Sequence, residues 1–152
     1  ALPISSAALS PALQSGIAGD PHYVHLLKGS MHAYRTESPF YVNWHQDTVA
    51  FYKRDKKARY QNVRYYFTEG LAVPMVSSAP IKAALLERRL FDQAIVGVFP
   101  HEEKYLYFLL AFLNTRLCEA FLRTLNPSAN QSANYLKKLP IVLPCRLMKS
   151  NN

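Results

Sequence analysis

Residues 106 to 113 form an unbroken apolar run, Leu106-Tyr107-Phe108-Leu109-Leu110-Ala111-Phe112-Leu113. Leucine, alanine and phenylalanine side chains continue at helical spacing as far as Phe121. This periodicity predicts one long helix over residues 102–124, with its apolar side buried and Pro127 ending it. The polar residues Asn114-Thr115-Arg116 interrupt the run, and a membrane span needs about 20 apolar residues. We therefore expect a core helix and no membrane span.

Upstream of this helix, short β-branched and aromatic segments predict strands. They cover residues 23–27, 40–44, 48–52, 63–67, 71–76 and 94–99. A short helix is predicted over residues 81–90, with Pro80 at its first position and Ser77-Ser78 as possible caps. A helical turn is expected at 132–136 and a last strand at 141–143. The pattern predicts an α+β fold, in which one long C-terminal helix crosses a twisted, mostly antiparallel sheet from residues 23 to 99. Trp44 is assigned to the core.

The length of 152 residues suits one domain with its own core. Residues 1–20 are small and interrupted by proline, which predicts a loosely packed linker. The domain would occupy residues 21–145 and a frayed tail residues 146–152. The opening has no basic leader and no long apolar core, so no signal peptide is expected. With Cys118 buried in a helix and Cys145 near the tail, we expect a reducing, cytoplasmic compartment and no disulfide framework.

Charge points to a polyanionic partner. The net charge is +8 and the isoelectric point is near 9.6. A basic segment carries six cations between residues 53 and 64, with tyrosines interleaved and only Asp55 opposing them: Lys53, Arg54, Lys56, Lys57, Arg59 and Arg64. Lysine and arginine make most phosphate contacts, and arginine also grips guanine. The segment is predicted to contact nucleic acid; the alternative is a solvated charged loop.

A polar segment follows the long apolar run, over residues 126–134. Asn130, Gln131 and Asn134 carry amides that can donate and accept together, which suits an adenine edge in the major groove. Lys137 and Lys138 add positive charge for phosphates just beyond. The alternative is an ordinary polar connecting loop, for which such residues are common.

Other chemistry is weakly indicated. His22, His25 and His32 lie close in sequence, but no carboxylate pair accompanies them, so no metal site is predicted. Asp92 and Glu102-Glu103, near Lys104, would suit a metal-dependent nuclease, although acidic residues also favour a helix N-terminus. The sequence has no Gly-x-Gly phosphate loop and no Gly-x-Ser-x-Gly elbow. We therefore predict no catalytic residue and no cofactor.

Several segments, in a fixed order, resemble a known family. Tyr41-Val42-Asn43-Trp44 is similar to its Val-x-Asn-Trp strand. The segment from Arg59 to Leu71 is similar to its Arg-x-x-Asn-x-x-Tyr-Tyr-Phe-x-x-Gly-Ile motif, and residues 107–116 to its Leu-x-x-Leu-Asn-Ser-Lys helix. The polar segment and Leu139-Pro140-Ile141 close the series. Together they resemble the C-terminal target-recognition domain of adenine-N6 DNA methyltransferases, of the fused restriction–modification, TaqI-like and BREX phage-defence kinds.

The resemblance implies a sequence-specific domain that binds double-stranded DNA and is not itself an enzyme. Methyl transfer would belong to an N-terminal methyltransferase domain of the parent protein, which uses S-adenosylmethionine and an Asn/Asp-Pro-Pro-Tyr/Phe loop facing a flipped adenine. Neither a glycine-rich cofactor loop nor that motif occurs in these residues. The alternative from another class is a protein-interaction or scaffold module, in which the long helix packs against a partner.

Overall fold

The structure is a computed structural model, which describes residues 4–29, 32–36, 39–76, 80–128 and 132–143. The strands are β1 (Tyr23–Leu27), β2 (Tyr41–Asn43), β3 (Gly70–Pro74), β4 (Ala84–Leu86), β5 (Leu90–Phe91) and β6 (Ile95–Val98). The α-helices are α1 (Gln46–Arg54), α2 (Leu106–Leu113), α3 (Arg116–Leu125) and α4 (Ala133–Leu136). Short 3-10 helices are η1 (Ser6–Ala8), η2 (Pro11–Ser15), η3 (Val63–Tyr65) and η4 (Glu103–Tyr105).

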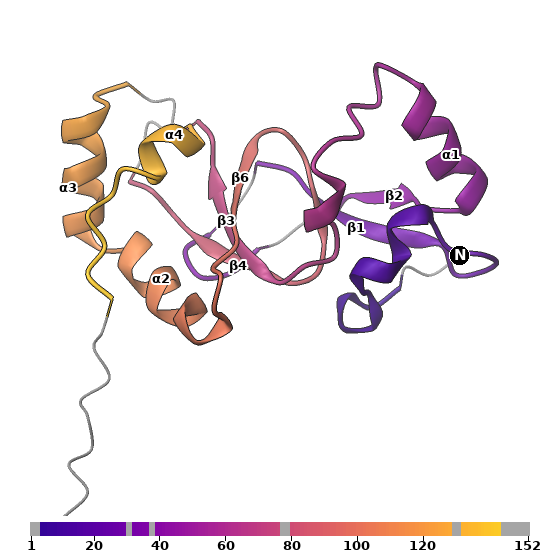
Figure 1. Ribbon diagram of the computed structural model, residues 1–152, viewed down its shortest axis with the longest axis horizontal. Coiled ribbons are helices and arrows are strands. Elements are labelled where there is room, and N and C mark those ends of the chain that lie inside the picture. The colour runs from indigo at the N-terminus through magenta and orange to yellow at the C-terminus, as the bar shows by residue number, and fades with distance from the viewer. Residues whose placement is uncertain (1–3, 30–31, 37–38, 77–79, 129–131, 144–152) are drawn as a thin grey trace, which may run out of the picture.

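The fold is α+β, as predicted, but its strands form two small sheets instead of one. The first has the order β2-β1-β5, with β1 antiparallel to β2 and parallel to β5. The second has the order β4-β3-β6 and is antiparallel throughout. Figure 1 shows α2, α3 and α4 at one end of the molecule, α1 at the other, and the strands between them.

The two sheets are joined where β5 leads into β6. Asp92 N donates to Leu27 O at 3.0 Å, just beyond the pairing of β1 with β5. Four buried side chains fill the space at this junction: Leu27, Ala72, Leu86 and Ile95. The change of sheet within a few residues explains why the sequence pattern, which shows only strand segments, predicted a single sheet.

The predicted long helix is two helices. A bend of 79° separates the segment Glu103–Leu113 from α3. Thr115 begins α3 as its cap, because its Oγ1 accepts from Cys118 N at 3.1 Å. The Asn114 side chain accepts from Ala83 N and donates to Ala83 O, so it pairs with a neighbouring segment as a strand would. The prediction of one helix over 102–124 is wrong because these two polar residues satisfy other backbone groups.

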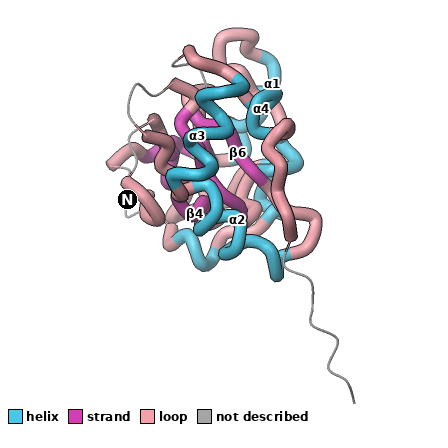
Figure 2. Tube along the Cα trace, turned by 90° about the vertical axis from the view of Figure 1, so that its left-hand side faces the viewer, coloured by secondary structure: helices cyan, strands magenta, loops and turns pink. Residues whose placement is uncertain are grey.

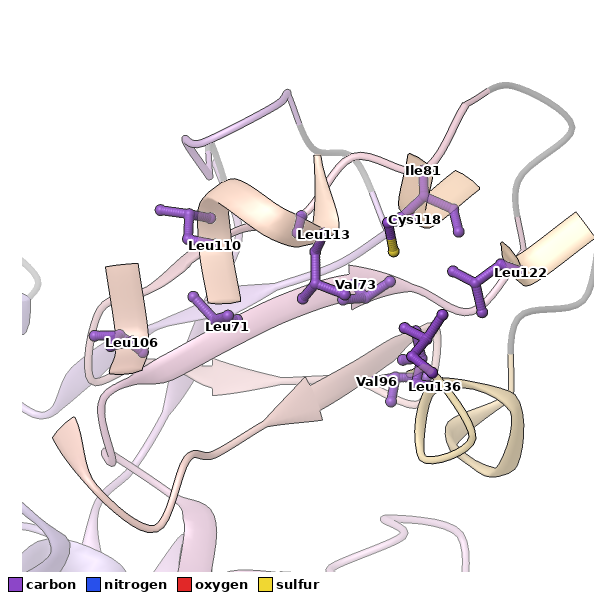
Figure 3. Packing of buried hydrophobic residues seen from close by; sticks show 12 residues of the cluster. Leu71, Val73, Ile81, Val96, Leu106, Leu110, Leu113, Cys118, Leu122 and Leu136 are labelled. Carbon is purple, nitrogen blue, oxygen red and sulfur yellow. The ribbon is translucent and has the colours of Figure 1, made fainter. Parts of the chain in front are cut away.

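The bend folds the C-terminal helices over the second sheet, as the end-on view in Figure 2 shows. Leu106, Leu110 and Leu113 of α2 and Leu122 of α3 are buried in one cluster with Leu71 and other strand residues. Figure 3 shows Leu113 beside Val73 of the sheet, and Leu122 near Leu136 and Val96. Within the described ranges, no single helix is long and apolar enough to cross a membrane. The segments Glu103–Leu113 and Arg116–Leu125 reach the length and apolar composition of a span only when they are counted together.

A second core lies around Trp44, which is 3% exposed, as predicted. Leu9 is fully buried in this cluster, and Ile4 N donates to Tyr23 O at 2.9 Å. The loose packing predicted for the first residues is therefore wrong for the described part from residue 4. Gly16, at φ 98°, allows this close packing, since a Cβ there would lie 2.7 Å from the Cα of Gln46.

Local patterns misled the prediction at four further places. Residues 48–52 belong to α1, in which Asp47 in the first turn and Lys53 and Arg54 in the last complement the helix dipole. Residues 63–67 contain η3 rather than a strand, because Asn62 turns the chain at φ 56°. Residues 81–90 contain β4 and the start of β5 instead of a helix, because pairing with β3 and β1 outweighs their helix propensity. Residues 141–143 are not in a strand.

Five predicted elements are confirmed. The segments 23–27, 40–44 and 94–99 contain β1, β2 and β6, the segment 71–76 overlaps β3, and 132–136 contains α4. The proposed caps Ser77 and Ser78, Cys145 and the tail lie outside the described residues.

Cys118 is fully buried, as predicted, and burial raises the pKa of its thiol from 9.0 to about 11. In a Cys145→Ser background, where Cys118 is the only thiol, we expect labelling by a disulfide reagent at pH 8 to be about 100-fold slower in buffer than in urea, since the thiolate reacts. Because the unfolded thiol ionises first, this group should also lower the stability as pH rises from 9 towards 11. Equal labelling rates would contradict the packing of α3.

Candidate nucleic-acid interface

Two adjoining hollows lie on the surface, one on each side of Asn62. The first, called here the aromatic pocket, has a volume of about 560 Å³ and is lined by five aromatic side chains: Trp44, Tyr52, Tyr60, Tyr66 and Phe91. The second, called the cleft, has a volume of about 650 Å³ and extends along β6 to α4. Asn62, Met75, Phe91 and Ile95 line both hollows, so the two adjoin, and together they are called here the groove.

The loop between α1 and β3 supplies much of the wall of the groove. Three residues of this loop that are not glycine have left-handed backbone: Arg59 at φ 50°, Asn62 at φ 56° and Phe67 at φ 58°. Such conformations are uncommon and cost energy, so surrounding packing must hold them. The fully buried Phe67 ring, which meets Trp44 edge to face at 5.5 Å, provides that anchor. The loop is thereby set with Arg59 and Asn62 on the groove.

The aromatic pocket has a wall of rings whose polar atoms are bonded elsewhere. Trp44 Nε1 donates to Leu13 O at 2.8 Å, and the Tyr60 hydroxyl donates to Gln14 O at 2.7 Å. The two rings stack at 6.2 Å between centroids, and Tyr66 meets both edge to face. Burial raises the pKa of Tyr60 and of Tyr66, so both phenols stay neutral at physiological pH. The wall is therefore uncharged and apolar.

The cleft has a stacked aromatic pair of its own. Tyr65 and Phe99 lie parallel, 4.5 Å between centroids and 12° between planes, and the Arg64 guanidinium lies 4.7 Å from the Tyr65 ring centre. Phe99 packs directly on Gly70 and Gly97, where an added Cβ would come within 2.6 Å of its ring. These two glycines thus allow the ring to lie flat between the sheet and Tyr65.

Positive charge converges on this groove from separate parts of the sequence. Lys57 and Arg59 line the aromatic pocket, and Arg64 and Lys137 line the cleft with His101. Among the described residues, no ion pair neutralises these four cations: Lys57, Arg59, Arg64 and Lys137. Lys137 follows α4 and Lys57 follows α1, which Figure 1 shows on either side of the strands. The tertiary structure therefore places Lys137 on the same groove as the basic segment.

The other predicted contact residues lie elsewhere or are not described. Lys53 and Arg54 belong to the last turn of α1, where Lys53 Nζ lies 5.8 Å from the Tyr60 ring centre and Arg54 Nε donates to Ala50 O. Lys56, Asn134 and Lys138 are exposed but do not line the groove. Asn130 and Gln131 lie outside the described residues. Sequence reasoning did not name Asn62, Gln93, Phe99 or His101 as contact residues, although Asn62 stands at the asparagine of the Arg-x-x-Asn motif.

The weaker sequence candidates are dispersed. His22 pairs with Asp20 at 2.7 Å, and its ring meets His45 edge to face. Asp92 lines the aromatic pocket, whereas Glu102 pairs with Lys104 beside η4. In the described part of the chain, no three His, Cys, Asp or Glu side chains are grouped as metal ligands would be.

Comparison with known proteins adds no relative: no family model matches this sequence, and no curated protein does.

Proposed function

We propose that this chain is the target-recognition domain of a restriction–modification or phage-defence adenine methyltransferase and binds double-stranded DNA along the groove. One observation supports DNA binding above others. Four cations that have no ion-pair partner among the described residues, drawn from positions 57 to 137, line the groove beside stacked aromatic rings. Scattered surface lysines would produce the same net charge without this convergence. Cations bind phosphates, and amides such as those of Asn62 and Gln93 read base edges.

The remainder of the proposal rests on the resemblance of the ordered motifs. The chain has no catalytic role of its own in this proposal, and S-adenosylmethionine binds to the N-terminal methyltransferase domain of the parent, its intramolecular partner. Methyl transfer by that domain takes place in the cytoplasm. Loop residues rather than the cores should then determine which DNA sequence is read, because the cores serve only to hold the loops.

The proposal is tested by fluorescence anisotropy with a labelled duplex over a series of salt concentrations. Binding through Z phosphates makes log affinity fall with log salt at a slope of about −0.9Z. We expect a steep negative slope, and a slope near zero would overturn the proposal. A duplex containing the methylation site of the parent should bind more tightly than a scrambled duplex of equal length.

The neighbouring residues Lys137 and Lys138 make a matched pair. Both are exposed, but only Lys137 lines the cleft, whereas Lys138 Nζ lies 6.0 Å from the Tyr135 ring centre. Lys137→Ala should reduce the salt slope by about 0.9, and Lys138→Ala should leave it nearly unchanged. Both variants lose one charge, so equal effects would show that net charge, and not the groove, governs binding.

A protein-interaction module is the second candidate, favoured by apolar side chains on α2 and α3. Tyr107 is 67% exposed and Leu117 58% exposed. If this face binds a partner, complex formation should tolerate high salt and should be weakened by Tyr107→Ser and Leu117→Ser. Neither substitution should change the affinity for DNA if the groove binds it.

A further inference from the structure

We propose that the aromatic pocket binds one unstacked nucleotide, with its base against the ring wall and its phosphate near Lys57 and Arg59. The inference deepens the proposed DNA-binding function and rests on it for the source of the nucleotide. An extrahelical residue of a DNA strand and a free mononucleotide share this chemistry. The experiment below separates these two sources.

The dimensions and walls of the pocket suit a planar aromatic ligand. Its volume of about 560 Å³ lies within the usual range for small-molecule sites. The Trp44 and Tyr60 rings direct their polar atoms into hydrogen bonds with Leu13 and Gln14. A ligand therefore meets ring surface and aliphatic side chains such as Leu26 and Leu90. Stacking on aromatic rings is the usual way that proteins hold an unpaired base.

Polar groups at the pocket match the edge of a base and its phosphate. The side chains of Gln61, Asn62 and Gln93 line it and make no hydrogen bond within the described ranges. Each amide can donate and accept. Among the described residues, neither of the adjacent cations Lys57 and Arg59 forms an ion pair, and both are placed to attract a phosphate. Apolar ligands and free aromatic amines would leave these cations without a partner.

The position of the Asp92 carboxylate lets us predict which bases the pocket favours. Its Oδ1 accepts from Ala94 N at 2.9 Å, which holds the carboxylate at the pocket and leaves Oδ2 for a ligand. A carboxylate accepts hydrogen bonds from an exocyclic amino group, as in cytosine, adenine or guanine. Thymine has no such group. We therefore expect dTMP to bind several-fold more weakly than dAMP, dCMP or dGMP.

Trp44 is the only tryptophan of the chain and lies in the pocket wall, so its emission reports occupancy directly. Wild-type protein titrated with dAMP, dCMP, dGMP and dTMP should show saturable changes in the millimolar range, weakest for dTMP. Asn62→Gly removes the amide while glycine keeps the backbone at φ 56°, and should weaken binding about 10-fold. Asp92→Asn, which is nearly isosteric, should abolish the discrimination against dTMP.

Arg59→Gly and Arg88→Gly are matched variants, since both arginines have positive φ, are exposed and carry one charge. Only Arg59 lines the pocket, so only Arg59→Gly should weaken mononucleotide binding. Circular dichroism and the unfolding midpoint show whether each variant is folded. The inference is overturned if no mononucleotide changes the Trp44 emission. It is also overturned if Arg88→Gly weakens mononucleotide binding as strongly as Arg59→Gly does.

The source is decided with two duplexes, one fully paired and one with a single bulged nucleotide. Preference of the wild type for the bulged duplex by about 10-fold, lost in Asn62→Gly, supports an extrahelical base. Tight binding of both duplexes without preference, and without a mononucleotide response, overturns the inference and leaves the proposed function intact. A mononucleotide response without binding of either duplex supports the pocket as a free-nucleotide site and overturns the proposed function.

Discussion

Neutralising the four groove cations is expected to weaken duplex binding about 100-fold at 0.1 M salt and to lower the salt slope by about 3.6, from four contacts of about 0.9 each. The substitutions are Lys57→Ala, Arg59→Gly, Arg64→Ala and Lys137→Ala. Glycine is chosen at Arg59 because the backbone there has φ 50°. Anisotropy titrations at several salt concentrations measure both quantities. The expected loss applies to every DNA sequence, because phosphate contacts carry no sequence information.

The control removes four cations that do not line the groove: Lys28→Ala, Lys82→Ala, Arg88→Gly and Arg116→Ala. Both quadruple variants change the net charge from +8 to +4, since each loses four positive charges. We expect the control to remain within a few-fold of wild type. Equal losses in the two variants would mean that the DNA responds to overall charge, and the proposed groove would then have to be abandoned.

Asn114→Ala is expected to destabilise the fold by about 1–3 kcal/mol, measured by urea unfolding. Its side chain accepts from Ala83 N at 3.1 Å and donates to Ala83 O and Leu110 O, each at 2.9 Å. Ala83 is fully buried, so truncation leaves its N–H without a partner and away from water, while its C=O keeps only the bond from Tyr34 N. The bend between α2 and α3 would also lose its link to the segment before β4.

Asn134→Ala is the control, since this asparagine is exposed on α4 and a substitution there should change stability by at most about 0.5 kcal/mol. Asn114→Asp adds a sharper comparison because it keeps the acceptor for Ala83 N while losing both donated bonds. It should also be strongly destabilising. A loss below about 1 kcal/mol in Asn114→Ala would show that packing alone holds the bend.

The candidate site could be predicted only in part. Clustered charge identified Lys57, Arg59 and Arg64 as candidate contacts, because electrostatic attraction depends on residue type and needs no knowledge of the fold. The pocket wall was not predictable. Trp44 and Phe91 are far apart in the sequence, and they share a pocket only because β2 and β5 flank β1. Likewise, only the course of the chain after α4 decides that Lys137 lines the cleft and Lys138 does not.

The sequence by itself determined the class of the fold, several strands, the burial of Trp44 and Cys118, and the excess of positive charge. These follow from local composition and periodicity, which act over a few residues. Only the tertiary structure decided the division into two sheets, the bend at Asn114-Thr115 and the meeting of distant cations on one groove. Each of these depends on hydrogen bonds or packing between segments remote in sequence, such as Asn114 with Ala83, and long-range pairing overrides local propensity.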